Sequence, residues 1–457
     1  MKLIAIILLL VASTSLNAQE RRPNIILMYT DDQPQNCLGI MGNSHIRTPN
    51  LDRLAQRGTL FNNAFVTTAI CCCNRACILT GQHMVRHGIR DFIEPLSSEA
   101  FDQTYPAILR KAGYRTGFLG KYAIGNPGKS SRELSLPAAK FDLWYGFDQG
   151  INFRQDIDGK PRYLTDVMTE KAIEFLQSHK QEKPFCLTLA FKEPHGPFNY
   201  FDPNVPDPYE SADLPLSPTC TEEDFAAQPE FIRKSLGADG SQKRLKRDAG
   251  SQSEMKTAYR LITRADQAVG KILGELERLK LDDNTVVIFS SDHGSLLGDH
   301  GLSGKWLMYE NSIRVPMIIY DPRVDQKLAG TRRDEMVLSI DLAPTLLALA
   351  GLVAPQSMQG KSMVPMVKNE SVSWRQHFYY EHTYQTERPR SPIPKTEGIR
   401  TTRWKYIRYP DIVPVAEQLF DLENDPLERK NLASIAEHSQ RLAELRELCE
   451  NERKTLR

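Results

Sequence analysis

The sequence has little net charge, few cysteines and no long hydrophobic run beyond its first residues. Of 457 residues, 58 are basic and 57 acidic, and this formal charge of +1 gives no support to a nucleic-acid partner. Only 8 cysteines are present, too few for a disulfide scaffold, and none has the paired C-x-x-C spacing typical of zinc sites. The chain also lacks internal repeats and low-complexity tracts.

The one apolar run at the beginning of the chain covers residues 3–12. It follows Lys2 and leads through small and polar residues to Ala18, as in a secretory signal peptide that is cleaved after Ala18. The run is well short of the about 20 residues that a helix needs to span a bilayer. We therefore predict a signal peptide over residues 1–18 and a secreted mature protein with no membrane span, most simply in the periplasm of a Gram-negative bacterium.

Four apolar runs each end in a polar cluster, and amphipathic helical patterns separate them. Runs this apolar are typical of strands buried on both faces of a parallel sheet. The alternation predicts an α/β fold with a large, mostly parallel sheet sandwiched by helices. Ligands of such folds bind beyond the carboxyl ends of the strands, so the four clusters are expected to meet in one cleft. The runs are NIILMYTDDQ, YRTGFLGKYAIG, PFCLTLAFKEPHGPF and NTVVIFSSDHG.

The character of the chain changes near Pro365. Aromatic, strand-like runs with turn signals between them follow this point, and an amphipathic helical pattern ends the chain. We predict a main domain over residues 19–365 and a smaller C-terminal α+β subdomain, with a small antiparallel sheet, over residues 366–457. The segment from about residue 200 to 250 has little periodicity and is predicted to be a surface excursion lining the mouth of the cleft.

Three carboxylates at two of the strand ends indicate a metal site. Adjacent Asp31 and Asp32 repel each other unless a cation lies between them. Asp292, at the end of another run, would complete an oxygen-rich site suited to Ca²⁺ or, as the second choice, Mg²⁺. One such pair alone more commonly caps a helix or forms a turn, but two clusters at equivalent strand ends favour a metal.

Histidines and cations accompany these carboxylates. His195 and His293 end two of the runs, Lys121 directly follows a third, and Lys305 lies in the loop SGKWLMYENSIRVP. Arg75 stands at a predicted helix start, where the helix N-terminus favours an anion. Each residue alone has an ordinary structural interpretation, and the prediction of an anion-binding site rests on their common setting.

The stretch TTAICCCNRACILTGQ, residues 67–82, contains three adjacent cysteines and then Arg75. Three adjacent thiolates do not easily converge on one tetrahedral zinc. A disulfide and a chemically modified nucleophile are both open interpretations of this stretch.

Several motifs in this order give the chain a resemblance to type I sulfatases of the alkaline phosphatase superfamily, over nearly all of the mature chain. They are RPNIILMYTDDQ, TPNLDRLAQRGTLFNNAF, CCCNRACILTGQ, GYRTGFLGK, PHGPF, DNTVVIFSSDHG, GKWLMYENSIRVP, WKYIRYP and QLFDLENDPLERKNLA. In that family a Cys-x-Pro-x-Arg core, or one with Ala in the middle, marks a cysteine that is oxidised to formylglycine (3-oxoalanine). Counting back from Arg75, the resemblance implies that this residue is Cys71. Its implied partner is a formylglycine-generating enzyme or an anaerobic sulfatase-maturating enzyme.

The resemblance also implies a role for each cluster. The implied ligands of Ca²⁺ are Asp31, Asp32, Cys71 (as formylglycine), Asp292 and His293. The implied catalytic residues are Cys71 as nucleophile, Arg75 to orient it, Lys121 and Lys305 to hold sulfate oxygens, and His195 to protonate the leaving alcohol.

Two positions depart from the pattern of the family. Cys73 stands where the core has Pro or Ala. Ala123 in GKYAIG stands where the family has a histidine that helps deprotonate the formylglycine hydroxyl. For Cys72, Cys73 and Cys77 we expect burial beside the site and no catalytic role.

The function implied by the resemblance is hydrolysis of sulfate esters, on a sulfated sugar or polysaccharide fragment. The stretch GQHMVRHGIRDF resembles carbohydrate sulfatases, and its polar residues are predicted to line the substrate pocket: His83, His87, Arg90 and Asp91. One alternative is a phosphatase or phosphodiesterase of the same superfamily, which would need a Thr or Ser nucleophile and a second cluster of Asp and His. Another is an inactive relative that binds sulfated glycans with Cys71 unmodified.

Overall fold

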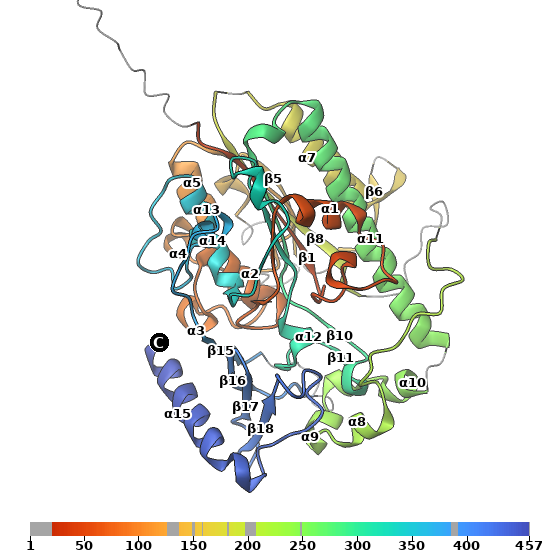
Figure 1. The fold of residues 1–457 in the computed structure, drawn as a ribbon. Helices are drawn as coiled ribbons and strands as arrows, with labels where there is room; N and C mark the ends of the chain where they lie inside the picture. Colours follow the sequence, from red (N-terminus) through yellow and green to blue (C-terminus); the bar gives the residue numbers. More distant parts are fainter. Residues whose placement is uncertain are drawn as a thin grey trace, which may run out of the picture.

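The structure is a computed structural model that describes residues 21–125, 137–148, 151–157, 159–180, 182–196, 207–246, 249–384 and 392–456. The predicted signal peptide lies outside these residues. Figure 1 shows a large sheet with helices on both faces and a small sheet near the C-terminus. The predicted α/β class and the small C-terminal sheet are therefore confirmed.

The large sheet has eight strands, in the spatial order β13-β2-β12-β9-β1-β8-β4-β5. The five strands from β9 to β5 are parallel, and β12 runs antiparallel to both of its neighbours. The four predicted runs form β9, β1, β8 and β4, which are consecutive neighbours. In sheet order the bounds are Thr331–Arg333, Thr59–Phe61, Met317–Tyr320, Thr285–Ser291, Asn24–Asp31, Phe185–Pro194, Arg115–Lys121 and Leu143–Phe147.

Strand β1 illustrates why this sheet is buried on both faces. All eight of its residues are buried. Ile25, Leu27 and Tyr29 belong to one hydrophobic cluster, and Ile26 and Met28 belong to another. Successive side chains of a strand point to opposite faces, so each cluster fills the space between the sheet and one helical layer.

Helices pack on both faces of the sheet (Figure 1). One layer contains α1 (Pro49–Arg57), α7 (Leu164–Gln177) and α11 (Ala249–Arg278). The other contains α2 (Cys71–Thr80), α5 (Tyr105–Lys111) and α13 (Leu342–Leu349). In α1 the buried residues Leu51, Leu54 and Ala55 have the i, i+3, i+4 spacing that gives a helix one apolar face.

The C-terminal part contains a four-stranded antiparallel sheet and the terminal helix α15 (Ser439–Thr455). Leu442, Leu445 and Cys449 of α15 pack on Tyr379 and Tyr406 of this sheet. The domain boundary predicted after residue 365 falls inside the short helix α14 (Val364–Val367), and we keep it as a proposal. The strands are β15 His377–His382, β16 Thr396–Thr401, β17 Trp404–Tyr409 and β18 Ala416–Asp421.

The predicted surface excursion is only partly correct. Within its described part, residues 207–246, short helices form and Tyr209, Leu214 and Ile232 are buried. Tyr209 and Leu214 pack with Cys37, Ile46 and residues of α11, and Ile232 belongs to the cluster on one face of the large sheet. The segment is therefore anchored in the main domain, which its irregular polarity did not reveal. Its elements are α8 Glu222–Ala226, α9 Glu230–Arg233, η3 Leu236–Ala238 and α10 Ser241–Leu245.

Short elements connect the main layers. They are η1 Gly39–Met41, β3 Ala64–Phe65, α3 Met84–His87, α4 Ser98–Asp102, η2 Ala138–Lys140, β6 Arg154–Ile157, β7 Lys160–Tyr163, η4 Asp282–Asn284, β10 Leu296–Leu297, η5 Asp299–Gly301, β11 Ser303–Gly304, α12 Glu310–Ile313, η6 Gln326–Leu328, β14 Val337–Leu338, η7 Ser339–Asp341 and η8 Ala436–His438.

All eight cysteines lie in described segments, and all are buried and free, so no disulfide forms among them. None of the helices in the described ranges combines the length and apolar character needed to cross a membrane.

Candidate active site

The candidate site lies where strands β1 and β9 end. These strands are adjacent and parallel, with Thr30 opposite Ser291, so the residues that follow them meet at one edge of the sheet. Asp31 and Asp32 therefore lie beside Asp292, and the backbone N–H of Asp32 donates to Oδ1 of Asp292 at 3.4 Å. The sequence prediction that these clusters share one cleft rests on the same parallel geometry.

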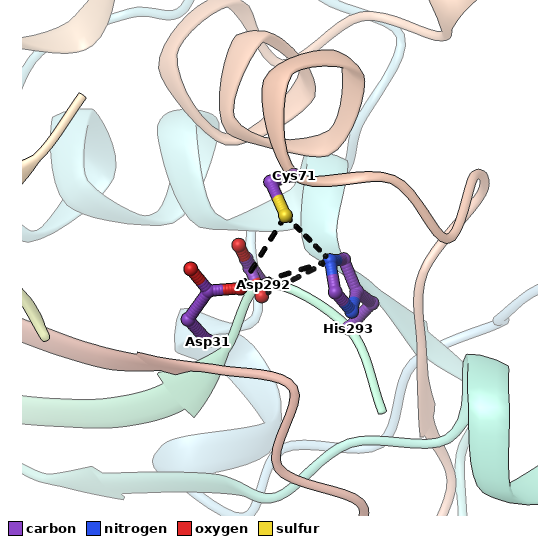
Figure 2. Close-up of side chains that lie close together, drawn as sticks. All are labelled: Asp31, Cys71, Asp292 and His293. Carbon is purple, nitrogen blue, oxygen red and sulfur yellow. Dashed lines mark hydrogen bonds and ion pairs between the residues drawn. The ribbon is translucent and has the colours of Figure 1, made fainter. Parts of the chain in front are cut away.

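Cys71 is the first residue of α2 and faces this edge of the sheet (Figure 2). Its Sγ atom lies 3.4 Å from Oδ1 of Asp31, 3.3 Å from Nε2 of His293 and 3.5 Å from Nζ of Lys305. Helix α2 ends at Gly81, whose φ of 66° is the left-handed conformation that closes many helices. Because every residue of α2 is buried, the helix holds the thiol firmly in place.

The thiol of Cys71 differs electrostatically from those of Cys73 and Cys77. Burial and the charge of Asp31 oppose its ionisation. Three cationic side chains outweigh both effects and hold the pKa of Cys71 well below its usual range. They are Lys121, Lys305 and His293. By contrast, burial raises the pKa of Cys73 and Cys77.

Three buried cations contact the three carboxylates. Lys121 Nζ contacts Oδ2 of Asp31, and Lys305 Nζ lies 2.6 Å from Oδ1 of Asp32. The guanidinium of Arg75 lies 2.8 Å from Oδ2 of Asp292. Unpaired charges buried this deeply would be strongly destabilising, so each cation helps to keep a carboxylate in the site.

The donor atoms around Cys71 fit one bound cation. One ligand atom from each of Asp31, Cys71, Asp292 and His293 can be chosen so that all lie within 4.8 Å of one another. Ligands at about 2.3–2.6 Å from a Ca²⁺ ion are separated by at most about 5.2 Å, so this spacing is suitable. Burial and the charge of Asp31 also raise the pKa of Asp292 to about 6, a sign of crowded negative charge that a cation would relieve. Asp32 lies in a second group with Asp31 and His195.

His195 follows strand β8 at the rim of the site. Its Nε2 atom lies 3.9 Å from Oδ2 of Asp32, and its side chain is 35% exposed, against 10% or less for Asp31, Asp32 and Asp292. Its Nδ1 atom is 2.7 Å from the carbonyl oxygen of Gly196. The imidazole therefore adjoins the buried charges and is also accessible to a molecule that enters from solvent.

The residues predicted to line the substrate pocket do not contact this cluster. His87 has Nε2 3.3 Å from Sγ of Cys77, and its Nδ1 accepts from the backbone N–H of Ile89. His83 is buried, and Arg90 is exposed. Their assignment to substrate binding therefore stays a prediction without support from these contacts.

Asn74 is a site residue that sequence reasoning missed. Its side-chain amide donates to the main-chain oxygen of Asp292 and its Oδ1 accepts from Ser339 Oγ at 2.6 Å. These bonds tie α2 to the end of β9. In the sequence, only the position of Asn74 directly before Arg75 could have indicated a role, and nothing pointed to Ser339.

The C-terminal sheet also supports the site. The hydroxyl of Tyr380 in β15 accepts from the backbone N–H of Ala69, two residues before Cys71. It donates to the carbonyl oxygen of Trp306, the residue after Lys305. One side chain of the smaller sheet thus joins the segments that carry two predicted catalytic residues.

A buried ion-pair network lies at the same junction. Glu310, at the start of α12, contacts Lys405 at 2.8 Å and Arg400 at 3.1 Å. Lys405 also lies 2.5 Å from Glu428, whose other oxygen accepts from the backbone N–H of Glu310. Since α12 follows Lys305 by five residues, this network anchors the loop that carries the lysine.

Comparison with known proteins identifies the family. The sulfatase family model matches residues 23–352, and a model described as N-sulphoglucosamine sulphohydrolase, C-terminal, matches residues 298–455. The chain belongs to the sulfatase family. It is a sulfuric ester hydrolase of the alkaline phosphatase superfamily.

Named relatives cover nearly the whole chain. An N-acetylglucosamine-6-O-sulfatase of Bacteroides thetaiotaomicron is 30% identical, over 95% of this chain and 87% of that protein. An arylsulfatase of Clostridium perfringens is 29% identical, over 93% of each chain.

Solved structures agree with this fold. One of them, in complex with its substrate D-glucosamine-2-N,6-O-disulfate, has a TM-score of 0.78 and 27% identity, over 95% of this chain and 98% of that one. A phosphonate monoester hydrolase of Agrobacterium radiobacter has a TM-score of 0.79 at 23% identity, over 95% and 96%, a similarity that shows the fold alone.

Proposed function

We propose that this enzyme removes sulfate from a sulfated sugar or polysaccharide fragment, with formylglycine at position 71 and bound Ca²⁺. The observation that carries the proposal is the setting of Cys71. It begins a buried helix, and its Sγ lies within 3.5 Å of Asp31, His293 and Lys305. A nucleophile here would meet both the metal ligands and the cations that an anionic ester requires.

Formylglycine and Ca²⁺ would supply the central chemistry. Formylglycine, as its hydrate, would supply an alkoxide nucleophile and a second hydroxyl that allows sulfate to leave. Asp31, Asp32, Asp292 and His293, with residue 71, would hold Ca²⁺, which would stabilise negative charge on the reacting oxygens. The same carboxylate and imidazole donors could also bind Mg²⁺, which is the less favoured ion.

The remaining side chains would act on the substrate and on residue 71. Arg75 is fixed by Asp292 and would orient residue 71 from within the same helix. Lys121 and Lys305 bring two buried positive charges next to residue 71, where they would hold sulfate oxygens as charge develops. His195 would donate a proton to the oxygen of the leaving alcohol, and its partial exposure suits contact with that group.

Two features of this chain bear on the reaction. Cys73 occupies the middle of the recognition core, so the formylglycine-generating or anaerobic maturating enzyme must accept cysteine there. Ala123 is buried and offers no proton acceptor where the family has histidine. Proton removal from residue 71 must therefore rely on another group of this site.

The sugar substrate is proposed from the relatives. One is named for 6-O-sulfated N-acetylglucosamine, and another was solved with a glucosamine that carries two sulfates. Export through the predicted signal peptide, to the periplasm of a Gram-negative bacterium, would bring the enzyme to such glycans. We further propose His83, His87 and Arg90 only as peripheral substrate contacts, because their side chains do not contact the cluster.

The test is sulfate release by protein purified from its native host. The panel contains N-acetylglucosamine 6-O-sulfate, D-glucosamine-2-N,6-O-disulfate, p-nitrophenyl sulfate and p-nitrophenyl phosphate, with Cys71→Ala as the control protein. We expect sulfate release from at least one sugar and none with Cys71→Ala. Faster phosphate release would favour the phosphatase alternative. Binding of sulfated sugars without turnover would favour the inactive relative.

A further inference from the structure

A cavity of about 430 Å³ adjoins the candidate site. Its lining includes Asp32 of the proposed metal site and Gly196, the neighbour of His195. The rest of the lining comes from the hairpin of β10 and β11 with the adjoining Ser295 and Gly298, and from Leu216, Asp239, Gly240, Lys243, Arg244, Glu254 and Met255. Figure 1 places α10 near this hairpin. A molecule in this cavity would therefore contact the segment that the sequence alone suggested was a surface excursion.

The size of the cavity fits a sugar better than a bare sulfate. Small-molecule sites typically enclose about 300–1,000 Å³, and this volume is within that range. Because Gly196 follows His195 directly, the cavity lies next to the proposed proton donor. The leaving alcohol of a sulfated sugar would be directed toward it.

Two neighbouring cations of α10 line the cavity and differ in their contacts. Arg244 is buried, and its guanidinium donates to the main-chain oxygens of Gly237, Asp239 and Gly301. Lys243 is exposed, and its side chain makes no ion pair or hydrogen bond with any residue in the described ranges. Arg244 therefore has a structural role, and Lys243 is a cation available to a ligand.

Two exposed carboxylates, Asp239 and Glu254, share the lining. Their charge disfavours an anion beside them and favours hydroxyl groups that donate hydrogen bonds. The cavity thus has a polar wall suited to sugar hydroxyls and one free ammonium group suited to an anion.

We propose that this cavity is the subsite for the sugar that carries the sulfate ester, and that Lys243 binds a second anionic group of the glycan. The inference rests on the proposed function, since it assumes that the alcohol released at His195 belongs to a sugar. The second anion is a further sulfate on the same ring or the carboxylate of a neighbouring uronic acid.

The test compares Lys243→Ala with Lys246→Ala, an exposed lysine of the same short segment that does not line the cavity. Three substrates are used: N-acetylglucosamine 6-O-sulfate, D-glucosamine-2-N,6-O-disulfate, and a disaccharide of hexuronate and 6-O-sulfated N-acetylglucosamine. We expect Lys243→Ala to lower kcat/KM about fivefold, mainly through KM, on a doubly charged substrate only. Lys246→Ala should change none of the rates, and added salt should reduce the fivefold effect.

The pattern across substrates identifies the anion and can overturn the inference. A loss confined to the disulfate assigns Lys243 to a second sulfate, and one confined to the disaccharide assigns it to a carboxylate. Equal losses on all three substrates, or no loss on any, would refute the role of Lys243 and leave the proposed function intact. Wild-type inactivity on all three sugars would overturn both proposals.

Discussion

The Nε2 atom of His293 lies 3.3 Å from the Sγ atom of Cys71, so the end of strand β9 meets the start of helix α2 at this contact. The two residues are 222 positions apart in the sequence. The proposed metal ligands and the proposed sulfate-binding lysines both converge on residue 71. In the proposed mechanism, the chemical state of that one side chain therefore decides whether the site can release sulfate.

The first prediction concerns the chemical state of residue 71. In protein from the native host, the tryptic peptide of residues 58–75 should carry an aldehyde at position 71 in place of the thiol. The proposed reaction needs an alkoxide nucleophile, and a thiol at position 71 cannot form one. Peptide mass spectrometry measures the change, and the same peptide from a host without a maturation enzyme is the control. An intact thiol in every molecule would support the inactive, glycan-binding alternative.

The second prediction concerns the metal. Asp292→Asn removes one of the few anionic ligands from a hard-cation site, so activity should fall by more than about 100-fold and recover in part at high Ca²⁺. Asp283→Asn, an exposed aspartate in the turn before β9, should have little effect. Sulfate release across a Ca²⁺ titration measures both variants.

A chelator gives an independent check of the metal. Excess chelator should abolish wild-type activity, and added Ca²⁺ should restore it. Full activity with the chelator present would refute the metal site, and activation by zinc alone would favour the phosphatase alternative.

The central strands of the large sheet could be predicted because each is a continuous apolar run in the sequence. The four runs became β9, β1, β8 and β4, whose parallel pairing brings their polar ends together. The outer strands β2 and β13 are only three residues long, and such short segments carry no periodicity that can be recognised. The burial of Tyr209 and Leu214 was missed because these apolar residues are widely spaced among polar ones and pack on other segments.

The candidate site could be predicted in part. The residues at strand ends, such as Asp31 and Asp292, follow from the fold because parallel strands end at the same edge. Contacts between distant segments do not follow, since they depend on how separate layers pack. The bond from Ser339 to Asn74 and the reach of Tyr380 to Trp306 are of this kind.

The third prediction tests the buried ion pairs behind Lys305. Glu310→Gln removes the charge that faces Lys405 and Arg400, so the free energy of unfolding at pH 7 should fall by about 3 kcal/mol. Glu423→Gln removes one partner of an ion pair in which both side chains are exposed, and it should cost less than about 1 kcal/mol. Urea unfolding followed by tryptophan fluorescence measures both losses.

The same variant has a defined pH dependence. Burial opposes ionisation of Glu310, but Lys405 and Arg400 outweigh it and hold its pKa well below the usual range. The contribution of this carboxylate to stability is therefore present above its unfolded pKa of about 4.3 and lost as the pH falls through the lower folded value. The difference between wild type and Glu310→Gln should narrow as the pH falls below about 4. A difference that widens below pH 4 would contradict this account.

The last prediction separates the proton donor from the groups that hold sulfate. A sugar alkoxide is a poor leaving group and needs a proton as the S–O bond breaks, whereas nitrophenolate leaves with little help. General acid catalysis supplies about 10²–10⁴-fold where it is needed, so His195→Ala should slow turnover of a sulfated sugar by about that factor and spare p-nitrophenyl sulfate. Lys121→Ala should slow both substrates alike, because both develop the same charge on the sulfuryl oxygens. Rates on the two substrates for each variant provide the comparison. Equal losses on both for His195→Ala would mean that this histidine binds sulfate or orders Asp32, and that another group donates the proton.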